Sequence, residues 1–185
     1  MNESEIDTEL EAQKQELIAA LKACGAIRYG DFTLASGKKS KYYIDIKKAS
    51  TDPKTLKLIA RQAASRIKQM DVNIIAGVEL GGVPLATAVS METELPLLIV
   101  RKAVKDYGTK SRFVGDIKPE DRLVMLEDVT TSGGSVKNAI EVVRETGANV
   151  KYVISVVDRE EGAIENLKET GTELVPLVSA SDLLK

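Results

Sequence analysis

The chain has 185 residues, of which 43% are hydrophobic and 29% are charged, and its formal net charge is −2. This balance predicts one globular domain with a continuous core and gives no general basic surface for nucleic acid. The sequence contains no histidine and one cysteine, Cys24, which excludes Ser-His-Asp and Cys-His catalysis, histidine-bound zinc and an internal disulfide.

No segment has the length and hydrophobicity of a membrane span, and residues 1–11 are too acidic and polar for a signal peptide. We therefore expect a cytoplasmic protein that binds neither membrane nor nucleic acid. No internal repeat or linker interrupts the sequence, so we expect a single domain over residues 1–185.

The first expected helix begins at Thr8, because Thr8 and Glu11 have the spacing of a capping box, and it ends near Gly25. Residues 31–46 then alternate as strands do, with a turn at Ser36-Gly37 and apolar positions that continue to Ile46.

From residue 53 onward, helical and strand patterns alternate. Helices are expected from Pro53 to Ile67, over 83–91 and over about 136–143, the last ended by Gly147. Short buried strands are expected at 74–76, 97–100, 123–126 and 150–157. This order predicts an α/β fold with a mostly parallel sheet flanked by helices. Ligands of such sheets bind beyond the carboxyl ends of the strands.

The loop after the strand at 123–126 carries the most specific pattern. Two adjacent acids, Glu127 and Asp128, precede a run of small residues that leads into a helix: Val129, Thr130, Thr131, Ser132, Gly133, Gly134 and Ser135. The amides and dipole of a helix N-terminus favour a phosphate, and the hydroxyls add donors. The acids suit vicinal ribose hydroxyls or a magnesium-bound pyrophosphate. The plainer alternative is a hydroxyl-rich helix cap beside two solvated acids.

This loop is neither a P-loop nor a GxGxxG fingerprint. It resembles the signature with which type I phosphoribosyltransferases bind phosphoribosyl pyrophosphate (PRPP). The resemblance implies that family's fold, with a small hood at about residues 1–50 and a core at about 51–185. It also implies that Glu127 and Asp128 hold the ribose hydroxyls, while residues 129–135 cradle the 5′-phosphate.

A second loop, Glu79-Leu80-Gly81-Gly82, follows the strand at 74–76, and its glycines allow backbone to approach a ligand closely. Taken alone it is equally well explained as a tight strand–helix turn. At this spacing it resembles the pyrophosphate loop of the family. Many bacterial members carry lysine where this chain has Gly81, so backbone amides would have to bind the pyrophosphate here.

A third segment, residues 101–110, contains four basic residues and one acid. A charge run of this kind is usually a solvated surface loop. However, Arg-Lys-x-x-Lys-Asp-x-Gly resembles the catalytic loop of orotate phosphoribosyltransferases, which closes over PRPP in the neighbouring subunit. The likeness implies that Arg101, Lys102 and Lys105 bind pyrophosphate and that Lys102, Lys105 and Asp106 take part in the chemistry. It also implies a homodimer whose 101–112 loop acts in the partner's site. Tyr107, where members often have histidine, can bind a phosphate oxygen.

Two further positions concern the base. Arg159 follows a strand and suits bidentate recognition of a carboxylate; an Asp158–Arg159 surface pair is the plainer alternative. In the family, such an arginine and a threonine of the PRPP loop hold orotate, which implies Arg159 and Thr131 here. Near the N-terminus, residues 32–40 resemble the hood, with Ala35 where bacterial members often have lysine, and Tyr42 and Tyr43 could flank the base.

The resemblance covers roughly residues 10–185. It implies transfer of phosphoribosyl from PRPP to orotate, giving orotidine 5′-monophosphate and pyrophosphate, as in de novo pyrimidine biosynthesis. Mg²⁺ would be held mainly through PRPP, with no direct protein ligand. Two alternatives remain: the same fold acting on a purine, and a PRPP-sensing regulator that binds nucleic acid. The basic loop and Arg159 disfavour the first, and the absence of a basic excess disfavours the second.

Overall fold

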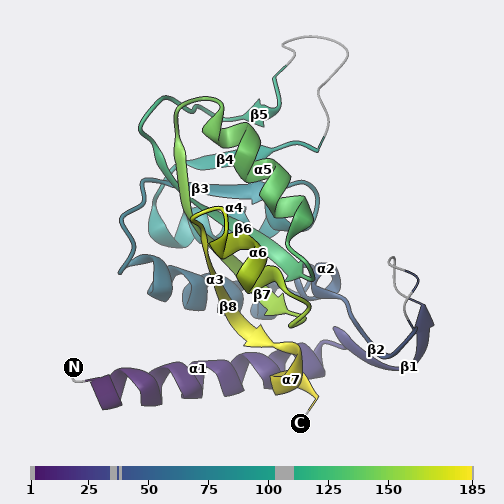
Figure 1. The fold of residues 1–185 in the computed structure, drawn as a ribbon. Coiled ribbons are helices and arrows are strands. Elements are labelled where there is room, and N and C mark those ends of the chain that lie inside the picture. Colours follow the sequence, from purple (N-terminus) through teal and green to yellow (C-terminus); the bar gives the residue numbers. More distant parts are fainter. Residues whose placement is uncertain (1–2, 34–36, 38, 103–110, 185) are drawn as a thin grey trace.

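The computed structural model describes residues 3–33, 37, 39–102 and 111–184. Its core is a six-stranded sheet with the order β5-β4-β3-β6-β7-β8 (Figure 1). Five strands run parallel: β3 (Ile74–Val78), β4 (Leu97–Val100), β6 (Arg122–Thr130), β7 (Asn149–Asp158) and β8 (Glu173–Ser179). The short β5 (Phe113–Val114) pairs antiparallel with β4 at one edge. The expected mostly parallel sheet is therefore confirmed.

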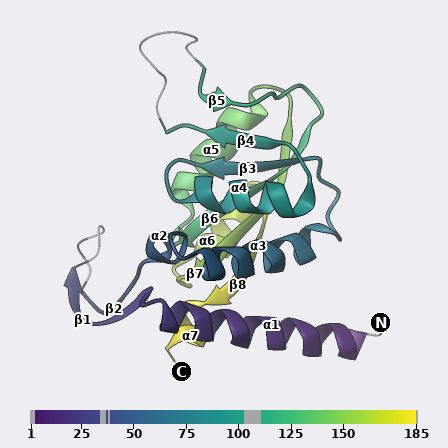
Figure 2. The same cartoon turned by 180° about the vertical axis from the view of Figure 1, so that it is seen from behind.

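Helices cover both faces of this sheet. The helices α3 (Pro53–Ile67) and α4 (Gly82–Thr93) pack on one face, and α1 (Glu3–Ala23) lies beside α3, on the side away from α4 (Figure 2). On the other face lie α5 (Gly134–Arg144) and α6 (Ala163–Lys168). Each face has its own buried apolar cluster, because successive side chains of the central strands point to opposite sides. No helix in the described part of the chain is long and apolar enough to cross a membrane.

The first helix differs from its expected start. It begins at Glu3, so Thr8 lies inside it and the capping box expected there is wrong. Two glutamates, Glu3 and Glu5, precede Thr8, and glutamate has a higher helix propensity than threonine. Its expected end is confirmed: the helix stops at Ala23, and Gly25 has a φ of 70°.

The strands β1 (Ile27–Thr33) and β2 (Lys39–Ile44) form a separate antiparallel hairpin, with Ile27 opposite Ile44. This hairpin projects away from the sheet, on the side where α2 lies (Figures 1 and 2). Ile46 does not extend the strand, as the alternation had suggested. It begins the short helix α2 (Ile46–Ala49), because the Asp45 side chain accepts a hydrogen bond from the Lys48 amide and caps the first turn.

The centre of the sheet contains a topological switch. β3 and β6 are neighbours, but β3 continues through α4 to β4 on one side, whereas β6 continues through α5 to β7 on the other. In open parallel sheets, ligands bind outside the carboxyl ends of the strands at such a point. The loop after β3 and the last residues of β6 meet there, and these are two of the segments that the sequence had singled out.

Candidate active site

The two acids at the end of β6 face opposite sides of the sheet. Along β6, Leu126 belongs to the apolar cluster under α3 and α4, whereas Met125 belongs to the cluster under α5. Continuing this alternation, Glu127 lines a small cavity at the start of α5, and Asp128 lies against α2 and the loop after β3. The two carboxylates at the end of β6 therefore lie on opposite faces of the sheet, Glu127 beside the start of α5 and Asp128 beside the loop after β3.

Asp128 forms an ion pair with Lys47, a residue of α2 that the sequence motifs did not indicate. Partial burial lowers the pKa of Lys47, but the hydrogen bond from Lys47 to Asp128 and the negative charge of Asp128 outweigh this effect and raise it. This contact connects the segment that carries the hairpin to the centre of the sheet.

The loop between β3 and α4 packs directly against Asp128. A Cβ atom added at Gly81 would lie 2.3 Å from Oδ2 of Asp128, and one added at Gly82 would lie 2.3 Å from the carbonyl oxygen of Leu126. Neither position has room for a side chain unless its neighbour moves. The absence of a side chain at Gly81 therefore allows Asp128 to occupy this place. The same loop contains a cis peptide bond between Glu79 and Leu80.

Glu127 is mostly buried, and this burial is the main reason that its pKa rises to about 8. The negative charge of Asp128 adds to the rise, while Lys102 and Lys47 oppose it. Its Oε2 atom is buried and has no hydrogen-bond partner among the described residues. At neutral pH the isolated chain therefore holds a largely protonated Glu127 beside the cavity, with one oxygen ready to bind an incoming group.

A cradle for an anion lies next to Glu127. Residues 129–136 and Glu127 line a cavity of about 110 Å³. The helix α5 begins here after Gly133, which has a φ of 78°, and no side chain caps its first turn. Asn166 of α6 donates a hydrogen bond of 2.9 Å to the Ser132 carbonyl and fixes the loop. An uncapped helix start lined by exposed hydroxyl residues favours a phosphate.

Thr130 is oriented differently from the expected donor. Its hydroxyl is buried and donates to Oδ1 of Asp158 at 2.9 Å, so its side chain does not face the cradle. The cause is again strand alternation, which places Thr130 on the same face as Asp128. Burial raises the pKa of Asp158, although this hydrogen bond opposes the rise. Thr131 and Ser132, by contrast, are exposed beside the cavity.

Arg159 contacts the hairpin and does not form the surface pair with Asp158 that the sequence left open. Its Nε donates to Oε1 of Glu161 at 2.9 Å, and its side chain is only 8% exposed. The guanidinium lies 5.1 Å from the centre of the Tyr42 ring, a cation–π arrangement. Glu161 and Tyr42 thus hold Arg159 in place, and Glu161 had no sequence signal beyond its proximity to the arginine.

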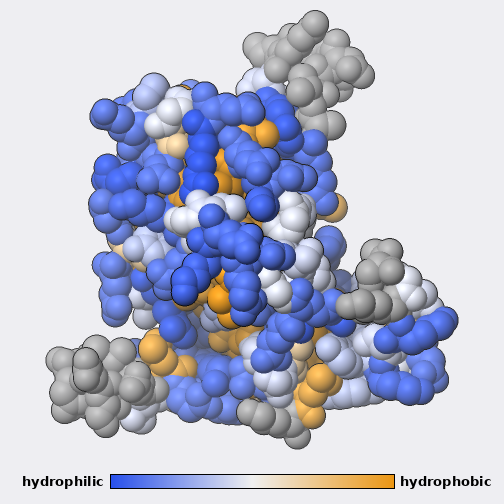
Figure 3. Space-filling model, viewed as in Figure 1, coloured by the Kyte–Doolittle hydropathy of each residue, from blue (hydrophilic) through white to orange (hydrophobic). Residues whose placement is uncertain are grey.

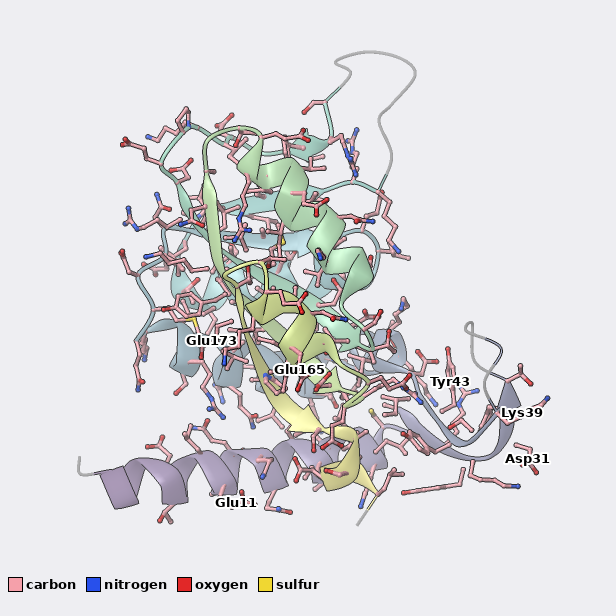
Figure 4. All side chains as sticks on the ribbon, viewed as in Figure 1. Glu11, Asp31, Lys39, Tyr43, Glu165 and Glu173 are labelled. Carbon is pink, nitrogen blue, oxygen red and sulfur yellow. The ribbon has the colours of Figure 1, made fainter. Side chains whose placement is uncertain are left out.

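The hairpin separates the two tyrosines that were expected to flank the base. Tyr42 lies under Arg159, whereas Tyr43 packs against Phe32, with ring centres 5.6 Å apart. Successive residues of a strand point to opposite sides, so only Tyr42 faces the arginine. Figure 4 shows Tyr43 on the hairpin together with Lys39 and Asp31, well away from the sheet.

The basic segment is described only at its two ends. Lys105, Asp106 and Tyr107 lie outside the described residues, as does Ala35 of the hairpin. Arg101 pairs with Arg112 through a backbone hydrogen bond of 2.8 Å, and the Lys102 amide donates to Oε2 of Glu79 at 3.4 Å. Arg101 and Lys102 therefore start the segment beside the loop that contains Gly81.

Comparisons with known proteins agree with this geometry. Residues 48–172 match the phosphoribosyl transferase domain family. The orotate phosphoribosyltransferase of Methanosarcina mazei is 85% identical over 182 residues, which are 98% of this chain and 97% of that protein.

Solved structures give the same result. The orotate phosphoribosyltransferase of Aeropyrum pernix has a TM-score of 0.82 at 33% identity and covers 91% of this chain and 96% of its own. That of Mycobacterium tuberculosis, solved in complex with PRPP, has a TM-score of 0.78 at 27% identity, with 94% and 99% covered. The chain therefore belongs to the orotate phosphoribosyltransferase family, within the phosphoribosyl transferase domain fold.

Proposed function

We propose that this protein transfers the phosphoribosyl group from PRPP to orotate, releasing pyrophosphate and forming orotidine 5′-monophosphate for pyrimidine biosynthesis. The observation that carries the proposal is the end of β6, where Glu127 lines a small cavity at an uncapped helix start and Asp128 faces the loop that contains Gly81. The acids can accept hydrogen bonds from the hydroxyls of a phosphorylated ribose, and the cradle can donate hydrogen bonds to its phosphate.

In this proposal, Glu127 and Asp128 hold the ribose hydroxyls, and the amides and exposed hydroxyls of residues 131–135 bind the 5′-phosphate. The pyrophosphate lies on the loop that contains Gly81, close to Arg101 and Lys102. Lys105, Asp106 and Tyr107 act from the same segment. These roles fit the placement of the described residues around one crevice at the topological switch.

The base is assigned to orotate because of Arg159. Its guanidinium is held by Glu161 and Tyr42, so it has little freedom to turn away from a bound carboxylate. A purine carries no carboxylate and would leave this arginine without a ligand partner. Thr131, exposed at the edge of the cradle, is the second group proposed for orotate.

The reaction needs pyrophosphate to leave the anomeric carbon before or as the orotate nitrogen attacks. The basic residues Arg101, Lys102 and Lys105 stabilise the charge that develops on the leaving group, and the acids orient the ribose. Closure of residues 101–112 over the site excludes water, which would otherwise capture the activated ribose.

Magnesium fits this site as an ion that arrives with PRPP. The described residues contain no group of three side chains that could hold a metal by themselves. Mg²⁺ usually combines one or two carboxylates with substrate phosphates, and the unpartnered Oε2 of Glu127 is an oxygen of the kind that it prefers. When bound, the ion neutralises part of the pyrophosphate charge.

We further propose a homodimer in which α4 contributes to the interface. Leu80 and Met91, before and within α4, are 69% and 79% exposed, and the sequence of this helix is mostly apolar. The opposite face of the molecule, over α5 and α6, is mainly hydrophilic (Figure 3). Leu80 and Met91 are the most exposed large apolar residues in the described part of the chain, which favours a contact with a second copy on this side. A hood formed by residues 1–50 and a cytoplasmic location remain predictions from the sequence.

The test is the loss of orotate absorbance on mixing the protein with PRPP and Mg²⁺, beside a panel of purine and pyrimidine bases. Consumption of orotate alone, with one pyrophosphate released per orotate, is the expected result. Turnover of a purine in place of orotate would refute the role of Arg159 while leaving the PRPP site intact. Binding of PRPP without turnover of any base would favour a regulator.

A further inference from the structure

Lys47 provides a cation to the site, although no motif points to it. It belongs to α2, and its ammonium group pairs with Asp128 across 81 positions of sequence. The two side chains are unequally exposed, at 61% for Lys47 and 8% for Asp128. The acid is therefore fixed in the sheet, and the lysine reaches it from the surface on a flexible stem.

In the free protein, Lys47 pairs with Asp128, the carboxylate that the proposed function assigns to a ribose hydroxyl. Oδ2 of Asp128 accepts the hydrogen bond from Lys47, and Gly81 lies so close to the same oxygen that a Cβ atom added there would clash with it. If Asp128 binds a ribose hydroxyl, as the proposed function requires, the lysine must give up at least part of this contact. Among the described residues, no other basic side chain pairs with Asp128 to replace it.

A diphosphate bound on the loop of residues 79–82 could bind the Lys47 ammonium group after it leaves Asp128. Oδ2 of Asp128 lies close both to the Lys47 ammonium and to Gly81 of the loop of residues 79–82, which contains one acid and no basic residue. A diphosphate bound on that loop would carry several negative charges within the reach of Lys47. Because Lys47 is the exposed partner, turning it from Asp128 toward a phosphate oxygen moves only its own stem.

We propose that Lys47 is a counter-ion exchanged during substrate binding: it neutralises Asp128 in the free protein and binds the diphosphate when the ribose takes over Asp128. This proposal rests on the proposed function, because it needs PRPP as the ligand. It assigns to α2 the positive charge that the glycine-containing loop lacks. It also predicts that replacing Lys47 changes the affinity for PRPP differently from the affinity for a ribose ligand without a diphosphate.

Replacement of Lys47 should have opposite effects on two ligands. Lys47→Met removes a competitor for Asp128, so orotidine 5′-monophosphate, which has the ribose but no diphosphate, should bind equally well or up to about fivefold more tightly. PRPP loses a charge-assisted contact, so its dissociation constant should rise about tenfold. Lys47→Arg keeps the charge and should retain most of the PRPP affinity.

The experiment is isothermal titration of PRPP with Mg²⁺, and separately of orotidine 5′-monophosphate, into the full-length protein and its variants. Lys48→Met is the matched control, because Lys48 is also exposed in α2 but its ammonium lies near Gly25, away from Asp128. Thermal unfolding of each variant checks that the fold is retained. The control should bind both ligands as the wild type does.

Two results would overturn the proposal. Equal weakening of both ligands by Lys47→Met would mean that the lysine only maintains the position of Asp128, and unchanged PRPP affinity would mean that it never reaches the diphosphate. A wild-type protein that binds neither ligand would instead refute the proposed function itself. A wild type that binds both, together with unchanged PRPP affinity in Lys47→Met, would refute the Lys47 proposal alone.

Discussion

Glu127 and Asp128 are neighbours in the sequence but have different surroundings. Asp128 has Lys47 as a direct partner, whereas Glu127 has a buried oxygen without one. A buried carboxylate without a partner, such as that of Glu127, is costly to ionise in the free protein. A ligand that supplies hydroxyls or a cation lowers that cost. The difference between the two acids therefore leads to a prediction about stability and pH.

We expect Glu127→Gln to remove a pH dependence of stability. The pKa of Glu127 is about 8 in the folded chain and near 4.5 when unfolded. Its stabilising contribution is thus complete below pH 4.5 and is lost as pH rises toward 8, at about 1.4 kcal/mol per pH unit at most. Urea unfolding without ligand, from pH 5 to 9, should show the wild type losing stability relative to the variant. Parallel curves would contradict the raised pKa.

Arg159→Ala should mainly impair the use of orotate. The lost guanidinium is the group proposed for the carboxylate, so the KM for orotate should rise about tenfold or more, while the KM for PRPP changes little. Steady-state kinetics with each substrate varied in turn would measure both values. Arg28→Ala is a suitable control, because Arg28 lies on the hairpin beside Asp45, at 3.8 Å. An unchanged orotate KM in Arg159→Ala would remove the arginine from base recognition.

At the scale of elements, the start of α5 depends on two adjacent glycines with different requirements. Gly133 has a φ of 78°, in the left-handed region, whereas Gly134 is the first helical residue, and a Cβ added there would find its nearest neighbour 3.8 Å away. Only the first position requires glycine for its backbone conformation.

Gly133→Ala should therefore lower the free energy of unfolding by about 1 kcal/mol or more, because alanine is strained at positive φ. Gly134→Ala should be neutral or slightly stabilising, since alanine favours the helix. Urea denaturation of the two variants gives a matched comparison within one loop. Equal destabilisation would show that glycine is required at both positions because of packing in the cradle and not because of backbone conformation.

Much of the fold could be predicted from the sequence where local patterns were strong. The central strands are short apolar runs, α3 and α5 have clear helical periodicity, α4 is mostly apolar, and the acid, hydroxyl and glycine run at 127–135 indicated the cradle. β8 was not among the expected strands; it contains Pro176, which is tolerated there since β8 is an edge strand. α6 and β5 are too short for periodicity to reveal.

The parts of the site that were missed depend on tertiary contacts. Lys47 meets its partner only through the packing of α2 against the end of β6, and nothing near it in the sequence indicates Asp128. The inward orientation of Thr130 likewise depends on Asp158 in the neighbouring strand. Residue types therefore predicted which chemical groups line the crevice, but the direction in which each side chain points could be known only from the folded sheet.

For the whole molecule, the exposed apolar residues Leu80 and Met91 predict how the chain associates. Met91→Glu places a charge on the proposed interface and should convert a dimer to a monomer. Activity should fall as well, because the family resemblance implies that residues 101–112 act in the partner's site. Light scattering coupled to size-exclusion chromatography measures the change. Ile164→Glu, at an exposed position in α6 on the opposite face, is the control and should remain dimeric. A dimeric Met91→Glu would place the interface elsewhere.

The switch between β3 and β6 also affects the order in which the chain can fold. Pairing Ile74 with Leu123 joins residues that are farther apart in the sequence than the partners in any other described strand pair. Closing such a long loop is entropically costly, so contacts within β3-β4 and within β6-β7-β8 can form earlier. The crevice therefore arises only when these two halves dock. During synthesis, Gly81 can contact Asp128 only after β6 has emerged from the ribosome, so the crevice cannot form before that point.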